Sequence, residues 1–211
     1  MHNNKLITLI TNTNLLSEKK TIDLAKILVA AGLKRIQVRE KSMARKNLEN
    51  FIFELRKITL GECELIINGS LELARKYNCD GVHLPEKSAL INQINFKENS
   101  NLIFGRSVHN IINPKNKWQK KIDYIHLGSV FKSGSHPFLD PLDSEIINKT
   151  CALNNMQVML VGGITSSNLE KLNKFNINGV AIMRELLLNK EPESTYINLE
   201  KKINEKNQQR N

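Results

Sequence analysis

The sequence predicts a single closed (β/α)₈ barrel, and three observations lead to that fold class. Short apolar runs alternate with helical patterns along the chain, which is typical of βαβ units and a parallel sheet. Eight strand candidates follow one another, which favours a closed barrel over an open doubly wound sheet. The length of 211 residues suits one domain and lies near the lower end for such a barrel. We therefore expect one domain over residues 1–211, with a polar tail from about residue 200.

The expected strands are short runs rich in apolar and β-branched residues. In chain order they are Leu6–Thr11, Lys34–Arg39, Glu64–Asn68, Gly81–Leu84, Leu102–Val108, Tyr124–Gly128, Gln157–Gly162 and Gly179–Met183. The fourth strand is very short because Pro85 closes it. The eighth runs directly into a helical pattern.

The expected helices lie between these strands. They are Thr21–Ala31, Ala44–Leu60, Leu71–Tyr77, Ser167–Phe175, Glu185–Asn189 and Tyr196–Arg210, with a weak helical signal at Ala89–Asn92. The first helix carries Ile22, Leu24 and Leu28 on a broad apolar face, and Gly32 ends it.

The chain is basic, with a formal net charge of +10 from 31 Lys and Arg against 21 Asp and Glu. Such a balance is typical of proteins that bind nucleic acid, an anionic membrane or phosphorylated small molecules. An A+T-rich genome, which favours Lys, Asn and Ile, would produce the same composition. The basic residues are scattered, and their one dense stretch, residues 115–121, holds a single aromatic residue, Trp118. We therefore expect no nucleic-acid partner.

Cysteine usage and hydropathy predict a cytoplasmic protein. Cys63, Cys79 and Cys151 form neither a Cys-x-x-Cys motif nor a metal-binding spacing, so buried thiols in a reducing compartment explain them best. The apolar run Leu6–Ile10 is too brief for a signal-peptide core. No stretch approaches the roughly 20 apolar residues of a membrane helix, so we expect no membrane partner.

Polar residues at the C-terminal ends of the strands would face the active site of a barrel. The second strand ends in Gln37, Arg39 and Lys41, whose period of two directs the three side chains to one face. Arg offers a planar fork and Lys a compact charge, and the pair suits a phosphate or diphosphate. A solvated strand end with alternating charges would have the same spacing.

The next strands end in further polar residues. Asn68 ends the third strand, and Ser107 lies near the end of the fifth. Lone His and Ser residues in such places, including His83 and His109, are more often structural than functional. In the sixth strand, the parity of His126 leaves open whether it faces the core or the site.

A hydroxyl-rich loop follows the sixth strand. It contains Ser133, Gly134, Ser135 and His136. Flexible glycine with flanking hydroxyls and an imidazole can hold an anion, although many loops of this composition are only connections.

The strongest local signal is the end of the seventh strand. Gly162 and Gly163 would let a phosphate approach backbone N–H groups, and Thr165 or Ser166 could cap the helix that follows. Together with Met183 and Arg184 after the eighth strand, this arrangement matches the phosphate site that barrels commonly build there. A turn followed by a helix cap would use the same residues.

Six motifs, in this order along the chain, resemble the thiamine phosphate synthase/TenI family. They are Gln37–Lys41, Asp80–Leu84, Gly105–His109, Asp123–Gly128, Gly162–Ile164 and Gly179–Met183. The resemblance extends from about Leu6 to Leu188 and implies a role in thiamine biosynthesis. The synthase of this family joins a hydroxymethylpyrimidine diphosphate to a thiazole phosphate and releases diphosphate. The implied partner is therefore a phosphorylated small molecule: thiazole phosphate and, for a synthase, also the pyrimidine diphosphate.

The resemblance also implies roles for the polar residues. Gln37, Arg39 and Lys41 would hold the diphosphate-bearing pyrimidine, with Asn68 and Ser107 nearby. The thiazole phosphate would be held by the loop of Ser133, Gly134 and Ser135 and by the turn of Gly162 and Gly163, together with Met183 and Arg184.

The chain departs from the synthase pattern at both Mg²⁺-binding positions. Gly69 replaces the acidic residue that follows Asn68 in the family, and Ser88 replaces a second Asp. Mg²⁺ prefers carboxylate and phosphate oxygens, so these losses leave the metal little anchorage unless Glu86 substitutes from a neighbouring position. We expect no metal ligand, and Mg²⁺ as a cofactor only if synthase activity is retained.

These losses favour the TenI-like branch, which includes a thiazole tautomerase that aromatises its substrate by proton transfer. That chemistry needs an acid/base group with a pKa near neutrality, which His provides best. The family's tautomerase His falls at Ser129, so we expect His136, or less readily His126, to serve instead. Three functions stay open: a divergent TenI-like enzyme, an active synthase, and a non-catalytic protein that binds thiazole or thiamine phosphate.

Overall fold

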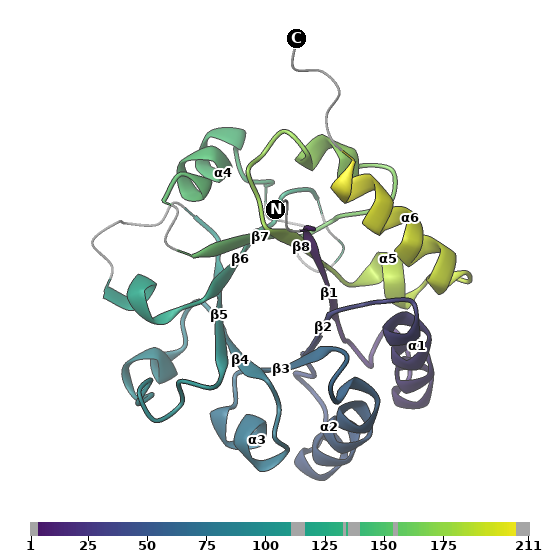
Figure 1. Ribbon diagram of the computed structural model, residues 1–211, viewed down its shortest axis with the longest axis vertical. Coiled ribbons are helices and arrows are strands. Elements are labelled where there is room, and N and C mark those ends of the chain that lie inside the picture. Colours follow the sequence, from purple (N-terminus) through teal and green to yellow (C-terminus); the bar gives the residue numbers. More distant parts are fainter. Residues whose placement is uncertain (1–3, 111–116, 133, 135–139, 154–155, 206–211) are drawn as a thin grey trace.

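The computed structural model describes residues 4–110, 117–132, 134, 140–153 and 156–205. Its centre is a closed barrel of parallel strands in which each strand pairs with the next along the chain and β8 returns to β1 (Figure 1). The strands are β1 (Leu6–Ile10), β2 (Arg35–Val38), β3 (Glu64–Asn68), β4 (Gly81–Leu84), β5 (Ile103–Val108), β6 (Tyr124–Gly128), β7 (Gln157–Val161) and β8 (Gly179–Ile182). The predicted (β/α)₈ barrel is confirmed.

Helices form a ring outside the barrel (Figure 1). The α-helices are α1 (Glu18–Ala30), α2 (Arg45–Thr59), α3 (Leu71–Lys76), α4 (Ser144–Cys151), α5 (Arg184–Leu187) and α6 (Pro192–Asn204). Three 3₁₀ helices complete the ring: η1 (Ala89–Asn92), η2 (Lys117–Lys121) and η3 (Leu169–Leu172). Helix α1 packs against both α2 and α6.

The apolar core lies between the strands and the helices. Leu9, Ile36 and Leu65 on the strands are fully buried, as are Leu28 and Phe51 on α1 and α2. Burial of each such side chain contributes about 1.5–3 kcal/mol. The apolar contacts that stabilise the fold thus lie on the outer face of the barrel, between strands and helices. The inner face can therefore hold polar side chains.

The interior of the barrel is unusually polar. Tyr124 of β6 is fully buried, and the Arg35 guanidinium carbon lies 4.5 Å from the centre of its ring. His83 and His126 are also buried beside it, with ring centroids 5.6 and 5.2 Å from that of Tyr124. Gly105 faces this ring, and any side chain at that position would collide with Tyr124. Arg35, His83 and His126 therefore surround the Tyr124 ring inside the barrel.

Four elements differ from the sequence predictions, and one of them is η2, where no helix was predicted. Helix α4 was not predicted, although Asp143 accepts a hydrogen bond from the Glu145 backbone N–H at 2.8 Å and caps it. The helix expected over Ser167–Phe175 is only the short η3. Helix α6 continues to Asn204 with Ile203 buried, so the polar tail does not begin at residue 200.

Two smaller predictions concern burial and hydropathy. Cys63, Cys79 and Cys151 are free and buried, as expected. Within the described part of the chain, no helix has both the length and the apolar character needed to cross a membrane.

Candidate active site

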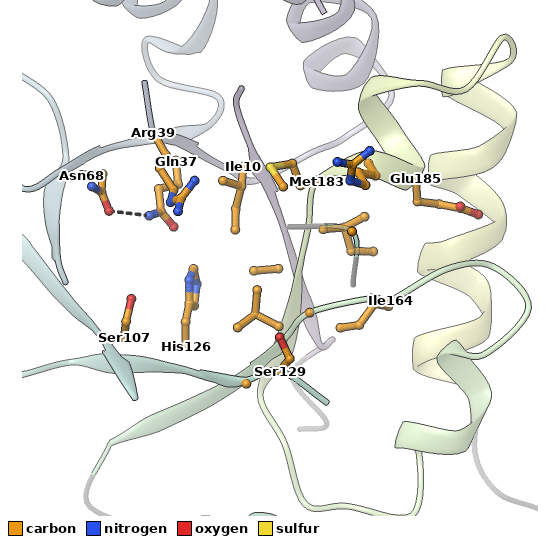
Figure 2. Close-up of a pocket in the computed structure, with 18 of the residues that line it drawn as sticks. Ile10, Gln37, Arg39, Asn68, Ser107, His126, Ser129, Ile164, Met183 and Glu185 are labelled. Atoms are coloured by element: carbon orange, nitrogen blue, oxygen red, sulfur yellow. Dashed lines mark hydrogen bonds between the residues drawn. The ribbon is translucent and has the colours of Figure 1, made fainter. Parts of the chain in front are cut away.

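A cavity of about 600 Å³ opens at the C-terminal ends of the strands. Figure 2 shows Gln37, Asn68, Ser107 and His126 on one side of it, and Ile164 and Met183 on the other. The predicted site residues that line it are Gln37, Arg39, Lys41, Asn68, Ser107, His126, Gly134, Gly162, Gly163, Met183 and Arg184. Ser133, Ser135 and His136 lie outside the described residues. The end of β2 and the glycine turn after β7 therefore share one cavity, and the roles of these residues stay predictions.

The end of β2 brings two positive charges close together. Burial lowers the pKa of Arg39, and the charge of Arg39 is the main cause of the lowered pKa of Lys41. Glu40, between them, accepts hydrogen bonds from the Thr11 and Thr13 hydroxyls at 2.6 and 2.7 Å. The Glu40 carboxylate is held by these two threonines and does not line the cavity. An anion from solution that binds between Arg39 and Lys41 would reduce the repulsion between their two positive charges.

Gln37 and Asn68 form an amide pair on the same side. The Gln37 Nε2 donates to Asn68 Oδ1 at 3.2 Å (Figure 2). The Gln37 Oε1 is buried without a hydrogen-bond partner within the described part of the chain. An unpaired buried acceptor is costly, so a donor group on a ligand would be stabilised at this point.

Ser107 belongs to a hydrogen-bonded chain that runs down into the barrel. Its Oγ lies 2.9 Å from His83 Nε2, and His83 Nδ1 lies 3.1 Å from the Tyr124 hydroxyl. Burial lowers the pKa of His83 to about 3. His83 therefore stays neutral and holds the Ser107 hydroxyl in place.

His126 faces the interior of the barrel, which settles the parity that the sequence left open. Its ring centroid lies 4.4 Å from that of His83. Burial lowers its pKa well below the ordinary value, and the neighbouring His83 lowers it further. Its Nε2 has no hydrogen-bond partner within the described residues. This environment opposes protonation, which disfavours His126 as an acid/base group near pH 7.

The turn after β7 requires its two glycines. Gly162 and Gly163 have φ angles of 103° and 64°, and a side chain on either would collide with the segment that follows β6. Asn168 holds the turn, because its Nδ2 donates to the Gly163 carbonyl at 2.8 Å. The prediction that Thr165 or Ser166 caps a helix is wrong. The Ser166 N–H and hydroxyl both donate to Glu185 Oε1, at 2.8 and 2.6 Å.

The ends of β6 and β8 meet beside this turn. A side chain on Gly134 would come within 3.2 Å of the Arg184 guanidinium, so that group packs against the Gly134 backbone. Met183 Sδ accepts a weak hydrogen bond from Asn12 Nδ2 at 3.8 Å. Arg184 and the glycine turn line the same cavity as Arg39, and a guanidinium beside backbone N–H groups is chemically suited to an anion.

The prediction of site residues missed Glu86 and His109, which both line the cavity. Glu86 Oε1 accepts a hydrogen bond from the His109 backbone N–H at 3.0 Å. The sequence did contain a signal, since His109 follows Ser107 by two residues at a strand end. A lone His in such a place is more often structural, so this signal alone does not identify a site residue.

The described residues do not fit the Mg²⁺ site that the family pattern implies. Gly69 has no side chain and a φ of 77°, and Ser88 offers only a hydroxyl. Glu86 is the remaining carboxylate near these positions, and its Oε1 is occupied by His109. No group of three His, Cys, Asp or Glu side chains in the described part of the chain could hold a metal ion.

Comparison with known proteins agrees with this architecture. Residues 7–186 match the family model described as thiamine monophosphate synthase. A putative thiamine-phosphate synthase 2 of Aquifex aeolicus is 31% identical over 155 residues, which is 73% of this chain and 83% of that protein. A thiamine-phosphate synthase of Clostridium tetani is 26% identical over 89% of this chain and 91% of its own length.

Among solved structures, the thiamine phosphate pyrophosphorylase of Pyrococcus furiosus superposes with a TM-score of 0.82. The alignment covers 95% of this chain and 96% of that one at 22% identity, and so supports the fold. Since the family model spans most of the barrel, the chain belongs to the thiamine phosphate synthase/TenI family.

Proposed function

We propose that this protein is a TenI-like isomerase that binds a thiazole phosphate and aromatises it by proton transfer without a metal. The observation that carries the proposal is the combination of two cationic subsites with the loss of both Mg²⁺ carboxylates, at Gly69 and Ser88. Diphosphate departure needs metal-assisted charge neutralisation, whereas a proton transfer between two carbon atoms does not.

The cavity suits a substrate with a phosphate at one end. Arg184 and the turn of Gly162 and Gly163 would hold the phosphate through a guanidinium and backbone N–H groups. The ring would then extend toward Gln37, whose unpaired Oε1 accepts a hydrogen bond. In the reaction a base removes a proton from one carbon of the non-aromatic ring, and its conjugate acid returns a proton to another carbon. The molecular formula does not change.

The proposal is tested by incubating the purified protein with the non-aromatic tautomer of the thiazole phosphate. Formation of the aromatic ring is followed by absorbance and by proton NMR. We expect conversion above the rate in buffer, with no change when a chelator removes divalent ions. Conversion no faster than in buffer would contradict the proposal.

The synthase is the alternative that the retained Gln37, Arg39 and Lys41 favour. A parallel reaction supplies the pyrimidine diphosphate, the aromatic thiazole phosphate and Mg²⁺, and measures released diphosphate. Rapid Mg²⁺-dependent release would establish the synthase. Binding of thiazole phosphate in calorimetry, without conversion in either reaction, would leave a non-catalytic binding protein.

A further inference from the structure

The His109 ring is held in one orientation at the rim of the cavity. Its Nδ1 lies 2.7 Å from the Gly128 carbonyl oxygen at the end of β6. A carbonyl can only accept, so Nδ1 carries the hydrogen and donates it. In the neutral ring the lone pair must then lie on Nε2, which leaves that atom able to take up a proton.

The backbone of His109 is fixed as well. Its N–H donates to Glu86 Oε1 at 3.0 Å, and the Arg106 side chain donates to the Glu86 carbonyl. The Arg106 guanidinium in turn lies 5.1 Å from the Trp118 ring centre. Anchors from the segment after β4 and from β6 therefore orient one imidazole, as expected of a preorganised acid/base group.

The other described histidines lack these properties. Both ring nitrogens of His83 are engaged, by Tyr124 and Ser107, and His126 lines the cavity only from its buried side, where its pKa is lowered well below the ordinary value. His109 lines the same cavity but is exposed, so that a ligand from solution can reach its ring. The remaining histidines, His2 and His136, lie outside the described residues.

We propose that His109 is the acid/base residue of this cavity, a step that rests on the proposed isomerase function. Its Nε2 takes a proton from one ring carbon of the ligand and returns a proton to another carbon, while the Gly128 carbonyl holds Nδ1–H. Four cationic side chains, Arg39, Lys41, Lys132 and Arg184, line the same cavity and would hold the ligand phosphate near this imidazole.

The first test is independent of turnover. In protein labelled with ¹⁵N-histidine, NMR distinguishes the two neutral tautomers, and the spectrum of His109→Gln assigns the His109 signals. We expect the Nδ1–H tautomer, and a shift of the Nε2 resonance when thiazole phosphate saturates the protein. An Nε2–H tautomer would overturn the proposal. If calorimetry shows binding but the Nε2 resonance does not shift, the role of His109 is contradicted and the proposed function is not. If thiazole phosphate does not bind at all, both the role of His109 and the proposed function are contradicted.

The second test measures the reaction. His109→Gln removes the imidazole while keeping a polar side chain of similar size, and thermal unfolding checks that it folds. We expect kcat to fall by about 10²- to 10⁴-fold, the range for general acid/base catalysis, with the Kd for thiazole phosphate within about threefold. The variants His126→Gln and His136→Gln are measured in parallel. Full activity in His109→Gln, with loss in either of the others, would assign the acid/base role elsewhere.

Discussion

The two arginines of β2 lie at opposite ends of the barrel and have opposite environments. Arg35 begins the strand, and its Nε lies 2.6 Å from Glu64 Oε2 while its guanidinium covers the Tyr124 ring. Arg39 follows the strand and has no carboxylate at ion-pair distance within the described part of the chain, and burial lowers its pKa. One guanidinium is paired by the fold, whereas the other has no ion pair within the described residues, is influenced by the charge of the neighbouring Glu40, and lines the cavity.

The same contrast holds for the carboxylates at the two ends. At the N-terminal end, Asp80 pairs with Arg56 at 2.7 Å and also accepts the Leu65 N–H. At the C-terminal end, Glu40 and Glu185 instead accept from hydroxyl and backbone N–H groups. The N-terminal end of the barrel thus holds its charges in ion pairs, whereas at the C-terminal end Arg39 forms no ion pair within the described residues, as expected where an anionic ligand binds.

The largest expected effect is on stability, from Arg35→Ala. The variant leaves Glu64 without its partner and opens space against the buried Tyr124. Because Glu64 can reach solvent, we expect a loss of about 2–4 kcal/mol rather than the full cost of an orphaned buried charge. Urea unfolding measures it, with Arg35→Lys as a partial replacement that should lose less. A loss below about 1 kcal/mol would show that the paired charges at the N-terminal end of the barrel contribute little to stability.

The complementary variant, Arg39→Ala, is expected to act on binding and not on folding. The affinity for thiazole phosphate or inorganic diphosphate should fall by about 1.5–3 kcal/mol, the range for hydrogen bonds to charged groups. The free energy of unfolding should stay within about 0.5 kcal/mol of the original. Calorimetry and urea unfolding measure the two quantities.

A matched control for this variant is Arg45→Ala on α2, where the arginine is exposed and paired with Glu49 and Glu72. It should leave the ligand affinity unchanged. Equal affinities for Arg39→Ala and the unaltered protein would remove β2 from the phosphate site.

The barrel and the position of its cavity could be predicted from the sequence because both depend on repeated local patterns. Strands β3, β4 and β6 have the predicted bounds, since each is an apolar run that ends at a clear change of composition. The residues at the ends of β2, β7 and β8 then meet in one cavity because all strands of a parallel barrel point the same way.

The contacts of individual side chains, by contrast, could not be predicted from the sequence. The sequence does not show that His126 lies against His83 at the buried side of the cavity, because the direction of an inward strand residue depends on register between strands distant in sequence. Nor does it show that the carbonyl of Gly128 fixes His109, because that contact joins the residue after β5 to the last residue of β6. These pairings are set by tertiary structure alone.

The smallest expected effect concerns the histidines inside the barrel, and it sharpens the contrast with the exposed rim. The folded-state pKa of His126 lies well below 6.5, and that of His83 is lowered to about 3, both through burial. Below pH 6.5 the unfolded chain therefore binds more protons than the folded one. Stability is present above this pH and is lost as the pH falls toward the folded-state values, by up to about 1.4 kcal/mol per pH unit for each histidine.

The variant His126→Leu removes one of these groups and one unpaired buried nitrogen. We expect its stability at pH 7.5 to match or exceed that of the unaltered protein. Between pH 6 and 4.5 its stability should fall less steeply, by up to about 1.4 kcal/mol per pH unit. Urea unfolding across this range measures both slopes. Parallel slopes would mean that His126 is protonated as readily in the folded barrel as in the unfolded chain, and the interior would then not be the closed region that its burial indicates.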